Sequence, residues 1–480
     1  MYFNSLTYLL FLFLFTLLYW QSNLQVRIIL IFTSSLLFYG FSGLEFLWIL
    51  LFSITFNWFL AKYLINLNKS YRFFLLLISL TFNIGLLFYF KYLIFFINNM
   101  VIFSNFLGIK VDPFFLNIIL PLGISFYTFQ IISYVLDVYR GTIKPENNFI
   151  LFGCYVIFFP QLVAGPILRS SEIIPQFLKK TKFSYDHIIV GLTRILYGLF
   201  LKVFLADNIA PLVDYGYAIP ANTLSAIDVW TLAFLFGFQI YFDFSAYSHI
   251  AVGSARVIGI YIPENFNFPY MATSPKEFWK RWHISLSSWV RDYIYLFLTR
   301  LKVFNKSTGG FVIKFNQIQF FPLFITWGIM GLWHGANWTF LVWGIYHFLF
   351  ICINRLIAPL TRNLNTIIAW WGGLIFTIPA MMLAWVPFRA QSVSDVVIMW
   401  FKIFDLKSYT QLSMRENTYL VTFMIFCGFF ITYFLKKKIF NQFKTKLFSE
   451  KIFNCFLISF IIFFVIIFFR SNNQFIYFQF

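Results

Sequence analysis

The stretch TWGIMGLWHGANWTFLVWGIYHFLF (Thr326–Phe350) is predominantly apolar, and as one helix it is long enough to cross the hydrocarbon core of a membrane. Its centre nevertheless holds His334, preceded by Trp333 and followed by Gly335 and Asn337. An imidazole in a lipid environment costs stability unless something compensates, and it is the side chain best suited to move a proton near neutral pH. The stretch therefore predicts a membrane helix with chemistry at His334; a buried histidine satisfied by a neighbouring group is the structural alternative.

The composition of the whole chain indicates the same setting. Of 480 residues, 60% are hydrophobic, 24% are aromatic and 11% are charged, and the mean hydropathy is +0.78. Soluble domains do not have this composition, and continuous rather than alternating apolar runs favour helices over a barrel. At about 20 apolar residues per crossing, we predict an all-α integral membrane protein with roughly 10 to 13 membrane helices. The clearest apolar runs are Leu6–Trp20, Phe73–Ile97, Phe114–Val135, Tyr419–Leu435 and Ile452–Phe469.

The formal net charge is +19, but the basic residues are spread through the short gaps between apolar runs. This distribution is typical of cytoplasmic loops rather than of a nucleic-acid-binding surface. We predict a multi-pass protein with an extracytoplasmic N-terminus and no nucleic-acid partner. For the lysines between residues 436 and 446, a surface helix on anionic lipid is a second interpretation. The residues expected on the cytoplasmic side are Arg27, Lys69, Arg72, Arg140, Lys144, Lys179, Lys180, Lys182, Lys436, Lys437, Lys438, Lys444 and Lys446.

No linker or low-complexity stretch divides the chain, so we expect one membrane domain over residues 1–480. It falls into N-terminal helices to about residue 110, a motif-rich centre over about 111–350 and C-terminal helices over about 351–480. The first apolar run lacks a basic start and a cleavage site, which predicts a retained helix. The four cysteines lie singly in apolar stretches, so neither a metal site nor a disulfide framework is predicted.

Two central segments carry unexpected polar or helix-breaking residues. In FFPQLVAGPILRSSEIIPQF (Phe158–Phe177), three prolines and a glycine interrupt an apolar run, which predicts a re-entrant or interfacial element. In the stretch that begins at Tyr241, Asp243, His249 and Arg256 interrupt an apolar helix. Such groups must pair or face a cavity, so we expect Asp243 to orient another polar group. Close packing around the small residues of this stretch is the structural alternative.

The segment SPKEFWKRWHISLSSWVRDYIYLFL (Ser274–Leu298) has a different character. It begins with a capping-box pattern with proline at the first helical position. Aromatic residues then alternate with basic ones, which predicts a helix in the membrane interface. Trp282 and His283 form a second tryptophan–histidine pair in this helix, and an interfacial structural histidine is the alternative interpretation. His347 lacks such company, and we interpret it as structural.

Taken together, these motifs resemble the membrane-bound O-acyltransferase (MBOAT) superfamily, in its bacterial branch of alginate and peptidoglycan O-acetylation and teichoic-acid D-alanyl transfer proteins. The resemblance covers most of residues 115–345. It rests on Pro160–Pro166 with Arg169, DFSAYS from Asp243, PENFNFPY (Pro263–Tyr270), FWKRWHISLSSWVRDYIY (Phe278–Tyr295), GLWHGANWTFLVWG (Gly331–Gly344) and AWVPFRAQSVSDV (Ala384–Val396). His249 departs from the pattern, because relatives usually carry an acidic residue there.

The resemblance implies a polytopic fold with re-entrant and interfacial helices around a central funnel. It also implies that His334 is the catalytic base and that His283 is a second essential position near the donor entrance, binding the carrier or helping to protonate the leaving group. Asn337 would orient the donor or the base. Trp333, Trp282 and Asp243 are expected to support the site. The expected ligands of the donor's phosphates are Arg169, Lys276, Lys280 and Arg281.

In that family the acyl group comes from a thioester, so the resemblance implies acetyl-CoA or another acyl thioester as donor, with no permanently bound cofactor. The C-terminal motif favours acetyl transfer across a bacterial inner membrane to an extracytoplasmic polysaccharide, together with an esterase-like acetyltransferase partner. D-alanyl transfer to teichoic acid from a carrier protein is the alternative within the family. A transporter or flippase is the alternative in another class, since inner polar residues and broken helices also mark transport pathways. Membrane lipid is a partner in every case.

Overall fold

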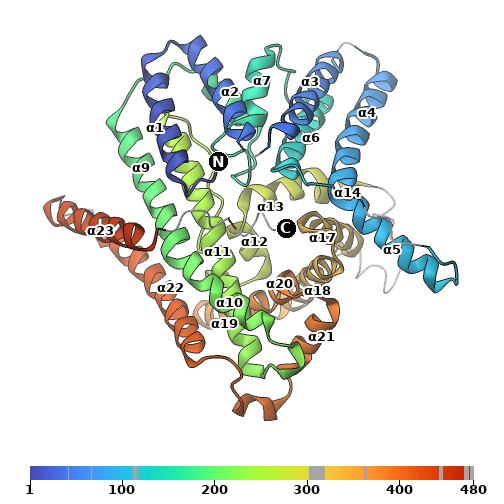
Figure 1. Ribbon diagram of the computed structural model, residues 1–480, viewed down its shortest axis with the longest axis vertical. Helices are drawn as coiled ribbons and strands as arrows, with labels where there is room; N and C mark the ends of the chain where they lie inside the picture. Colours follow the sequence, from blue (N-terminus) through green and yellow to red (C-terminus); the bar gives the residue numbers. More distant parts are fainter. Residues whose placement is uncertain are drawn as a thin grey trace. The chain divides into compact units, whose positions relative to one another are not determined.

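The computed structural model describes residues 1–41, 43–65, 67–111, 116, 118–301, 319–361, 365–442, 447–469 and 475, with the backbone alone for 436–442 and 447–457. Regular structure in these ranges is helical, without a strand (Figure 1). The helices group into two compact units, Met1–Ile195 with Ile250–Glu264, and Leu196–His249 with Asn265–Phe480, and each unit is described by itself. The single-domain organisation stays a prediction. Of the lysines expected at the cytoplasmic side, Lys444 and Lys446 lie outside the described residues.

Seven helices in this part of the chain are long and apolar enough to cross a membrane: Leu44–Tyr63, Lys69–Phe106, Tyr185–Ala218, Ala226–Val257, Trp338–Leu360, Thr366–Arg389 and Glu416–Leu435. Four shorter apolar helices accompany them: Leu6–Gln21, Leu24–Gly40, Phe320–His334 and Ile458–Phe468. The prediction of a polytopic, all-α membrane protein is confirmed. The seven long helices are fewer than the ten to thirteen expected, because several apolar runs form helices too short to cross about 30 Å alone.

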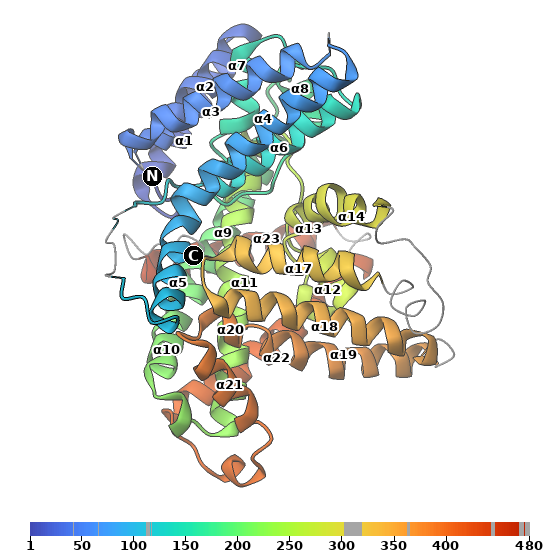
Figure 2. The same cartoon turned by 90° about the vertical axis from the view of Figure 1, so that its right-hand side faces the viewer.

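The first unit contains α1 (Leu6–Gln21), α2 (Leu24–Gly40), α3 (Leu47–Tyr63), α4 (Lys69–Leu87), α5 (Leu93–Phe106), α6 (Ile124–Arg140), α7 (Phe149–Ile157), α8 (Ser170–Leu178) and most of α9 (Tyr185–Phe200). Polar caps fix where these apolar helices begin, because a side-chain oxygen satisfies a backbone N–H that has no partner within the helix. The caps of α1, α2, α4 and α7 are Ser5, Asn23, Asn68 and Asn148. Figures 1 and 2 show α2 beside α7, and α4 beside α6.

Helix α6 corrects one expected membrane span. The apolar run Phe114–Val135 was expected to form a helix, but α6 begins at Ile124 and extends to Arg140. Gly123, which precedes it, has a positive φ of 72°, and a Cβ there would approach the Leu162 carbonyl oxygen to 2.8 Å. A left-handed residue followed by a helix start separates the run into two pieces. Phe114 itself lies outside the described residues.

The segment between α7 and α8 is irregular and buried, as the proline-rich sequence predicts. Helix α7 ends at Ile157, α8 starts at Ser170, and every residue from 158 to 168 is buried. Protein groups satisfy its polar atoms: the side-chain amides of Gln130 and Gln161 pair reciprocally at 3.2 and 3.0 Å, and the Phe159 N–H donates to Ser35 Oγ at 3.1 Å. Non-helical backbone at this depth is tolerated because protein, rather than lipid, surrounds it.

The second unit contains the end of α9, a π-helical turn (Leu201–Ala206), α10 (Asp207–Ala218), most of α11 (Ala226–Val257), α12 (Pro275–Arg281), α13 (Ile284–Val290), α14 (Leu296–Arg300), α17 (Phe320–His334), α18 (Trp338–Thr361), α19 (Thr366–Leu383), α20 (Val386–Arg389), α21 (Val393–Lys402), α22 (Glu416–Gln442) and α23 (Leu447–Phe468). Helices α17, α18 and α19 lie side by side (Figure 2). The Tyr346 hydroxyl of α18 donates to the Ala380 carbonyl of α19 at 2.8 Å.

The single membrane helix predicted over Thr326–Phe350 is wrong. Helix α17 ends at His334, α18 starts at Trp338, and the two form an antiparallel hairpin. Their close approach depends on two glycines, since a Cβ on Gly331 would lie 2.4 Å from the Phe340 carbonyl oxygen and one on Gly344 would lie 2.3 Å from that of Trp327. Small residues allow membrane helices to pack backbone against backbone. The apolar pattern identified the membrane segment but not its reversal of direction.

A buried ion cluster lies elsewhere in the second unit. Lys202, in the π-helical turn, places Nζ 2.9 Å from Asp207 Oδ1 and 2.7 Å from Asp243 Oδ1. Lys202 and Asp243 are each 2% exposed. Asp243 therefore pairs with a polar group, as its apolar sequence context predicted. Lys202 and Asp207 were not identified from the sequence, because a single lysine and a single aspartate in a long apolar run carry no pairing signal.

We expect Gly331→Ala to destabilise the second unit by about 1–3 kcal/mol, because the new methyl group meets backbone that cannot rotate away. Gly328→Ala on the same helix is the matched control, since nothing lies within 4 Å of its Cβ position. Alanine there gains up to about 1 kcal/mol of helix propensity. Thermal unfolding in detergent or nanodiscs measures both, and equal melting temperatures would contradict the packing argument.

We also expect Lys202→Met to cost about 3–5 kcal/mol, because it leaves two buried carboxylates without their shared cation. Adding Asp207→Asn and Asp243→Asn should recover much of this loss, since the charges that needed compensation are then removed. Lys180→Met at an exposed position is the control. Chemical unfolding of the four proteins checks the order, and a triple variant no more stable than Lys202→Met would refute the ion-cluster explanation.

Candidate active site

His283 lies between two short helices rather than inside the single interfacial helix that the sequence predicted. Helix α12 ends at Arg281, His283 adopts a left-handed conformation with φ 41°, and α13 begins at Ile284. A left-handed residue that is not glycine costs of order 1 kcal/mol and persists only where its surroundings enforce it. The continuous helix is therefore a wrong prediction, because aromatic and basic alternation does not report a single left-handed residue.

The start of α12 follows the predicted capping pattern. The Ser274 hydroxyl accepts a hydrogen bond from the Glu277 N–H at 3.2 Å, and Pro275 occupies the first helical position. The Glu277 carboxylate accepts from the Thr273 N–H and hydroxyl, both at 2.8 Å, and from Arg281 at 2.7 Å. Burial alone would raise the pKa of Glu277, but these hydrogen bonds and the Arg281 charge lower it below its ordinary value. Arg281 is thus held on α12.

The segment PENFNFPY holds His283 in place. The Asn267 N–H donates to the Arg281 carbonyl at 2.9 Å, and the Ile284 N–H donates to the Asn265 carbonyl at 3.0 Å. These two backbone bonds bracket His283 on either side. Asn265 Oδ1 also lies 3.1 Å from His283 Nδ1, and both residues are buried. The sequence singled out this segment without assigning Asn265 a role.

His334 is the last residue of α17, at the hairpin turn, and is 8% exposed. Aromatic rings enclose its imidazole: the ring centroid lies 4.9 Å from that of Trp333, 4.7 Å from Trp343 and 5.0 Å from Phe388. A Cβ on Gly335 would overlap Phe340, so the turn accepts only glycine without rearrangement. The turn places an imidazole at the end of a helix, inside an aromatic enclosure.

The two tryptophan–histidine pairs meet through Trp333. Its ring centroid lies 4.9 Å from that of His334 and 6.5 Å from that of His283. Phe244 of α11 also packs against His283, with the two ring centroids 4.6 Å apart. Trp282 packs in the core of the second unit, stacked on Phe278 at 5.6 Å and close to Trp385 at 4.8 Å. The structure therefore brings His283, Trp333 and His334 together.

Three other expected site residues lie in different surroundings. Asn337 is exposed and its Oδ1 accepts from the Thr339 N–H at 3.1 Å, so it caps α18 rather than contacting His334. Asp243 pairs with Lys202. Arg169 precedes α8 in the first unit and is described with that unit alone. His249, the departure from the family pattern, lies edge-on against Tyr197 with ring centroids 4.8 Å apart.

His347 has a more specific environment than a structural histidine requires. It is 1% exposed, and its ring centroid lies 4.6 Å from Trp343, 5.0 Å from Trp279 and 5.1 Å from Trp327. Within the described residues, neither ring nitrogen has a hydrogen-bond partner. Trp343 contacts both His334 and His347, so the two imidazoles share one indole. Trp279 and Trp327 are distant from His347 along the chain, so these two neighbours were not predicted.

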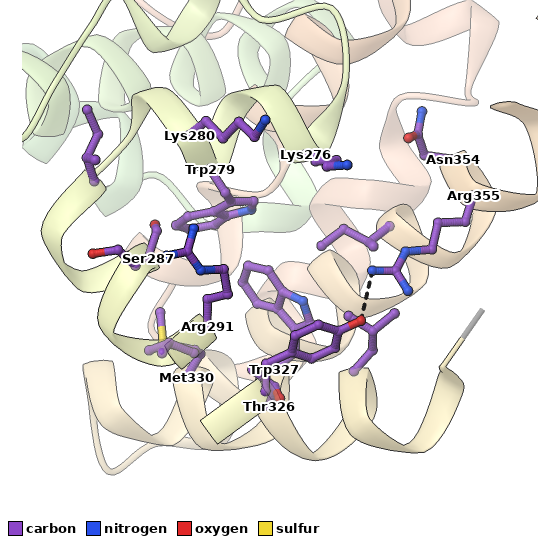
Figure 3. A pocket seen from close by; sticks show the side chains of 16 residues that line it. Lys276, Trp279, Lys280, Ser287, Arg291, Thr326, Trp327, Met330, Asn354 and Arg355 are labelled. Carbon is purple, nitrogen blue, oxygen red and sulfur yellow. Dashed lines mark hydrogen bonds between the residues drawn. The ribbon is translucent and has the colours of Figure 1, made fainter. Parts of the chain in front are cut away.

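A cavity of about 350 Å³ lies against this cluster, within the second unit. Trp279 and Trp327 form part of its wall, with the cationic groups of Lys276, Lys280, Arg291 and Arg355 around them (Figure 3).

Among the described residues that line the cavity, none is an aspartate or a glutamate. Arg355 donates to the Tyr295 hydroxyl at 3.2 Å, the dashed line in Figure 3. Arg291 reaches Asp292, beside it in the chain, at 2.8 Å. The cavity therefore favours an anion.

Of the basic residues predicted to bind phosphate, Lys276 and Lys280 line this cavity, whereas Arg281 is paired with Glu277. Arg291 and Arg355 were missed. Arg355 is a lone cation inside the apolar run of α18, and that placement is the signal that could have identified it. Metal chemistry has no candidate here, since no cluster of three metal-ligating side chains exists among the described residues.

Comparison with known proteins identifies the family of this chain. The family model of the membrane-bound O-acyltransferases matches residues 146–388. A probable alginate O-acetylase AlgI of Azotobacter vinelandii is 36% identical, over 85% of this chain and 79% of its own length. The peptidoglycan O-acetyltransferase of Helicobacter pylori is 35% identical, over 76% of this chain and 71% of its own length. A teichoic acid D-alanyltransferase of Bacillus subtilis is 32% identical, over 50% of this chain and 60% of its own length. The chain belongs to the membrane-bound O-acyltransferase family, and it is an O-acyltransferase.

Proposed function

We propose that this O-acyltransferase moves an acetyl group from a thioester donor to a hydroxyl group of an extracytoplasmic polysaccharide, with His334 as the general base. The observation that carries the proposal is the position of His334, on a helix end inside an aromatic enclosure and joined through Trp333 to His283. The alginate O-acetylase relative of Azotobacter vinelandii and the peptidoglycan O-acetyltransferase of Helicobacter pylori match 85% and 76% of this chain, against 50% for the D-alanyltransferase of Bacillus subtilis, which supports acetyl rather than D-alanyl transfer.

The reaction that His334 would serve is a simple exchange of acyl acceptors. The imidazole takes the proton of the acceptor hydroxyl as its oxygen attacks the thioester carbonyl. The new C–O bond forms, the C–S bond breaks, and the electron pair leaves with sulfur. The proton returns to the thiolate, so the products are an ester and a thiol. Excluding water protects the thioester from hydrolysis, and Trp333, Trp343 and Phe388 surround the imidazole with apolar surface.

The cation-lined cavity is the proposed donor site. Coenzyme A and the phosphopantetheine arm of a carrier protein both attach their thioester to a phosphate-bearing chain, and arginine and lysine bind phosphate by charge-assisted hydrogen bonds. Lys276, Lys280 and Arg355 supply three such groups around one opening, with Arg291 beside them in its ion pair with Asp292. The cavity wall continues through Trp279 into the aromatic cluster that reaches Trp343 and His334. Phosphate at the opening would thus direct the thioester end toward the histidine.

The proposal includes the cellular setting. The distribution of Lys and Arg supports an extracytoplasmic N-terminus in a bacterial inner membrane, with the donor on the cytoplasmic side. The acceptor is then reached on the opposite side, either as the polysaccharide itself or through an esterase-like acetyltransferase partner.

We expect His334→Ala to lower the rate of acetyl transfer by about 10²–10⁴, the usual contribution of a general base. The assay uses purified protein in liposomes, labelled acetyl-CoA and either alginate or peptidoglycan fragments. His187→Ala is the matched control, a half-buried histidine of the first unit. Both variants must elute as the wild type does. Transfer by His334→Ala at the wild-type rate would remove the central residue of the proposal.

We expect the double variant Lys276→Gln/Arg355→Gln to raise KM for the thioester donor at least about tenfold while kcat changes little, because each charge-assisted hydrogen bond contributes about 1.5–3 kcal/mol to binding. Lys407→Gln, at an exposed position outside the cavity, should leave KM unchanged. Steady-state kinetics with acetyl-CoA and with an acetylated carrier protein identify the preferred donor. An unchanged KM for both donors would show that the cavity does not bind them.

A further inference from the structure

A second cavity, of about 110 Å³, lies in the second unit at the C-terminal end of α10. The end of α10, the loop that follows it, the residues after α20 and the first turns of α21 form its wall. Helix α21 packs against that loop, and Figures 1 and 2 show α21 beside α10. The reaction proposed above leaves this α10–α21 cavity without a role.

The polar side chains of the α10–α21 cavity suit a hydroxyl-bearing ligand. Among the described residues that line it, none is a lysine, an arginine or a histidine, whereas cations surround the donor cavity. Gln391 is exposed, and its amide offers two donor hydrogens and an acceptor oxygen. Asp395 accepts the Ser392 hydroxyl on Oδ2 at 2.7 Å, and Oδ1 accepts no hydrogen bond from any described residue. A sugar hydroxyl can donate to these oxygens, whereas the carboxylate would repel a phosphate.

The end of α10 adds groups that need partners. Tyr217 lines the cavity, and its hydroxyl has no hydrogen-bond partner within the described part of the chain. Helix α10 ends at Ala218, which also lines the cavity, and the last carbonyl groups of a helix have no partner within it. Arg389 is already engaged, since it pairs with Asp214 at 2.7 Å and lies over the Tyr217 ring. Its charge is compensated, so it does not turn the cavity into an anion site.

Helix α20 connects this cavity with the surroundings of His334. Phe388 packs against His334 with ring centroids 5.0 Å apart, and Ala390, two residues later, lines the cavity. Phe388 also packs against Phe340 near the start of α18, at 5.0 Å. Arg355 of the donor cavity lies 15 residues farther along α18, which is about 22 Å at 1.5 Å per residue. The two cavities therefore lie toward opposite ends of α18.

The basic residues that flank the membrane helices favour an extracytoplasmic position for the α10–α21 cavity. The helix Tyr185–Ala218 ends at this cavity, and the lysines at 179, 180 and 182 precede its other end. The helix Glu416–Leu435 is followed by the lysines at 436, 437 and 438. The Ser413 hydroxyl donates to the Thr223 carbonyl at 3.1 Å, so the lysine-free ends of both helices lie together. Lysines mark cytoplasmic ends, in agreement with the proposed orientation.

We propose that the α10–α21 cavity is an acceptor subsite, which holds the hydroxyl-bearing edge of one sugar residue while a neighbouring hydroxyl of the same glycan reaches His334. This inference rests on the proposed function, because it takes the transfer to end on an extracytoplasmic polysaccharide. Cavities of about 150 Å³ hold one six-membered ring, so about 110 Å³ admits the edge of one sugar. The single serine hydroxyl of a partner protein would leave most of these polar groups unused.

Glycan binding in the absence of donor tests the subsite directly. The double variant Gln391→Leu/Asp395→Asn should bind glycan about tenfold more weakly or worse, because it removes one hydrogen-bonding side chain and the charge of another. The matched control is Gln411→Leu/Asp405→Asn, an exposed pair outside the cavity. Isothermal titration of the proteins in nanodiscs uses a peptidoglycan glycan fragment and an alginate oligosaccharide, and the tighter binder identifies the glycan.

Equal affinities of the two double variants, or no binding of either glycan by the wild type, would overturn the subsite. The titration needs no turnover, so its outcome is separate from that of the His334→Ala assay, which tests the proposed function. Where transfer is found, the Gln391→Leu/Asp395→Asn enzyme should show a higher KM for the glycan with little change in kcat or in the donor KM. A higher KM for the donor alone would overturn the assignment.

Cysteine labelling tests the side of the membrane. Gln391→Cys should react with a membrane-impermeant maleimide added outside intact cells, and added glycan should slow the reaction. Lys276→Cys, in the donor cavity, should react only after the membrane is opened. The wild-type protein gives the background from the native cysteines. Labelling of Gln391→Cys only in opened cells, or at a rate that glycan does not change, would overturn the proposal.

Discussion

Polar groups at membrane depth must find their partners inside the protein, and this constraint shapes both units. In the first unit it explains the reciprocal Gln130–Gln161 pair and the Ser35 hydroxyl that accepts from an irregular, buried segment. In the second unit it explains why Lys202 is shared by two carboxylates. Lipid offers no hydrogen bonds, so each break in a helix needs a protein group to satisfy it. The break at His283, where Asn267 and Asn265 supply the backbone partners, is a further instance of the same requirement.

The two helix ends are also where the chemistry is concentrated. A helix that continued through His334 would direct its imidazole toward one fixed face, whereas the hairpin turn presents it among Trp333, Trp343 and Phe388. The left-handed backbone at His283 turns that imidazole toward Trp333 and Phe244. Asn265 and the glycines of the α17–α18 hairpin are therefore as important to the arrangement as the histidines. Membership in the acyltransferase family disfavours the transporter alternative.

The sequence was sufficient for the membrane class and the family. It was insufficient where a few backbone angles decide the geometry. Polar residues at His334, Asn337 and His283 marked candidate sites, but they did not reveal that the backbone reverses after His334 and turns left-handed at His283. Contacts between distant segments were equally hidden: Trp279 and Trp327 enclose His347, and Arg355 joins Lys276 at one cavity. Asn337 accepts from the Thr339 N–H at the start of α18, a capping role that its proximity to His334 in sequence did not indicate.

The central claim is that acyl transfer, and not transport, occurs at the joined histidines. The most direct measurement uses proteoliposomes with the thioester donor on one side and the polysaccharide acceptor on the other. It counts the thiol released and the ester formed in the same sample. We expect one thiol per ester, with neither product when donor or acceptor is omitted. Movement of either substrate across the membrane without release of thiol would contradict it.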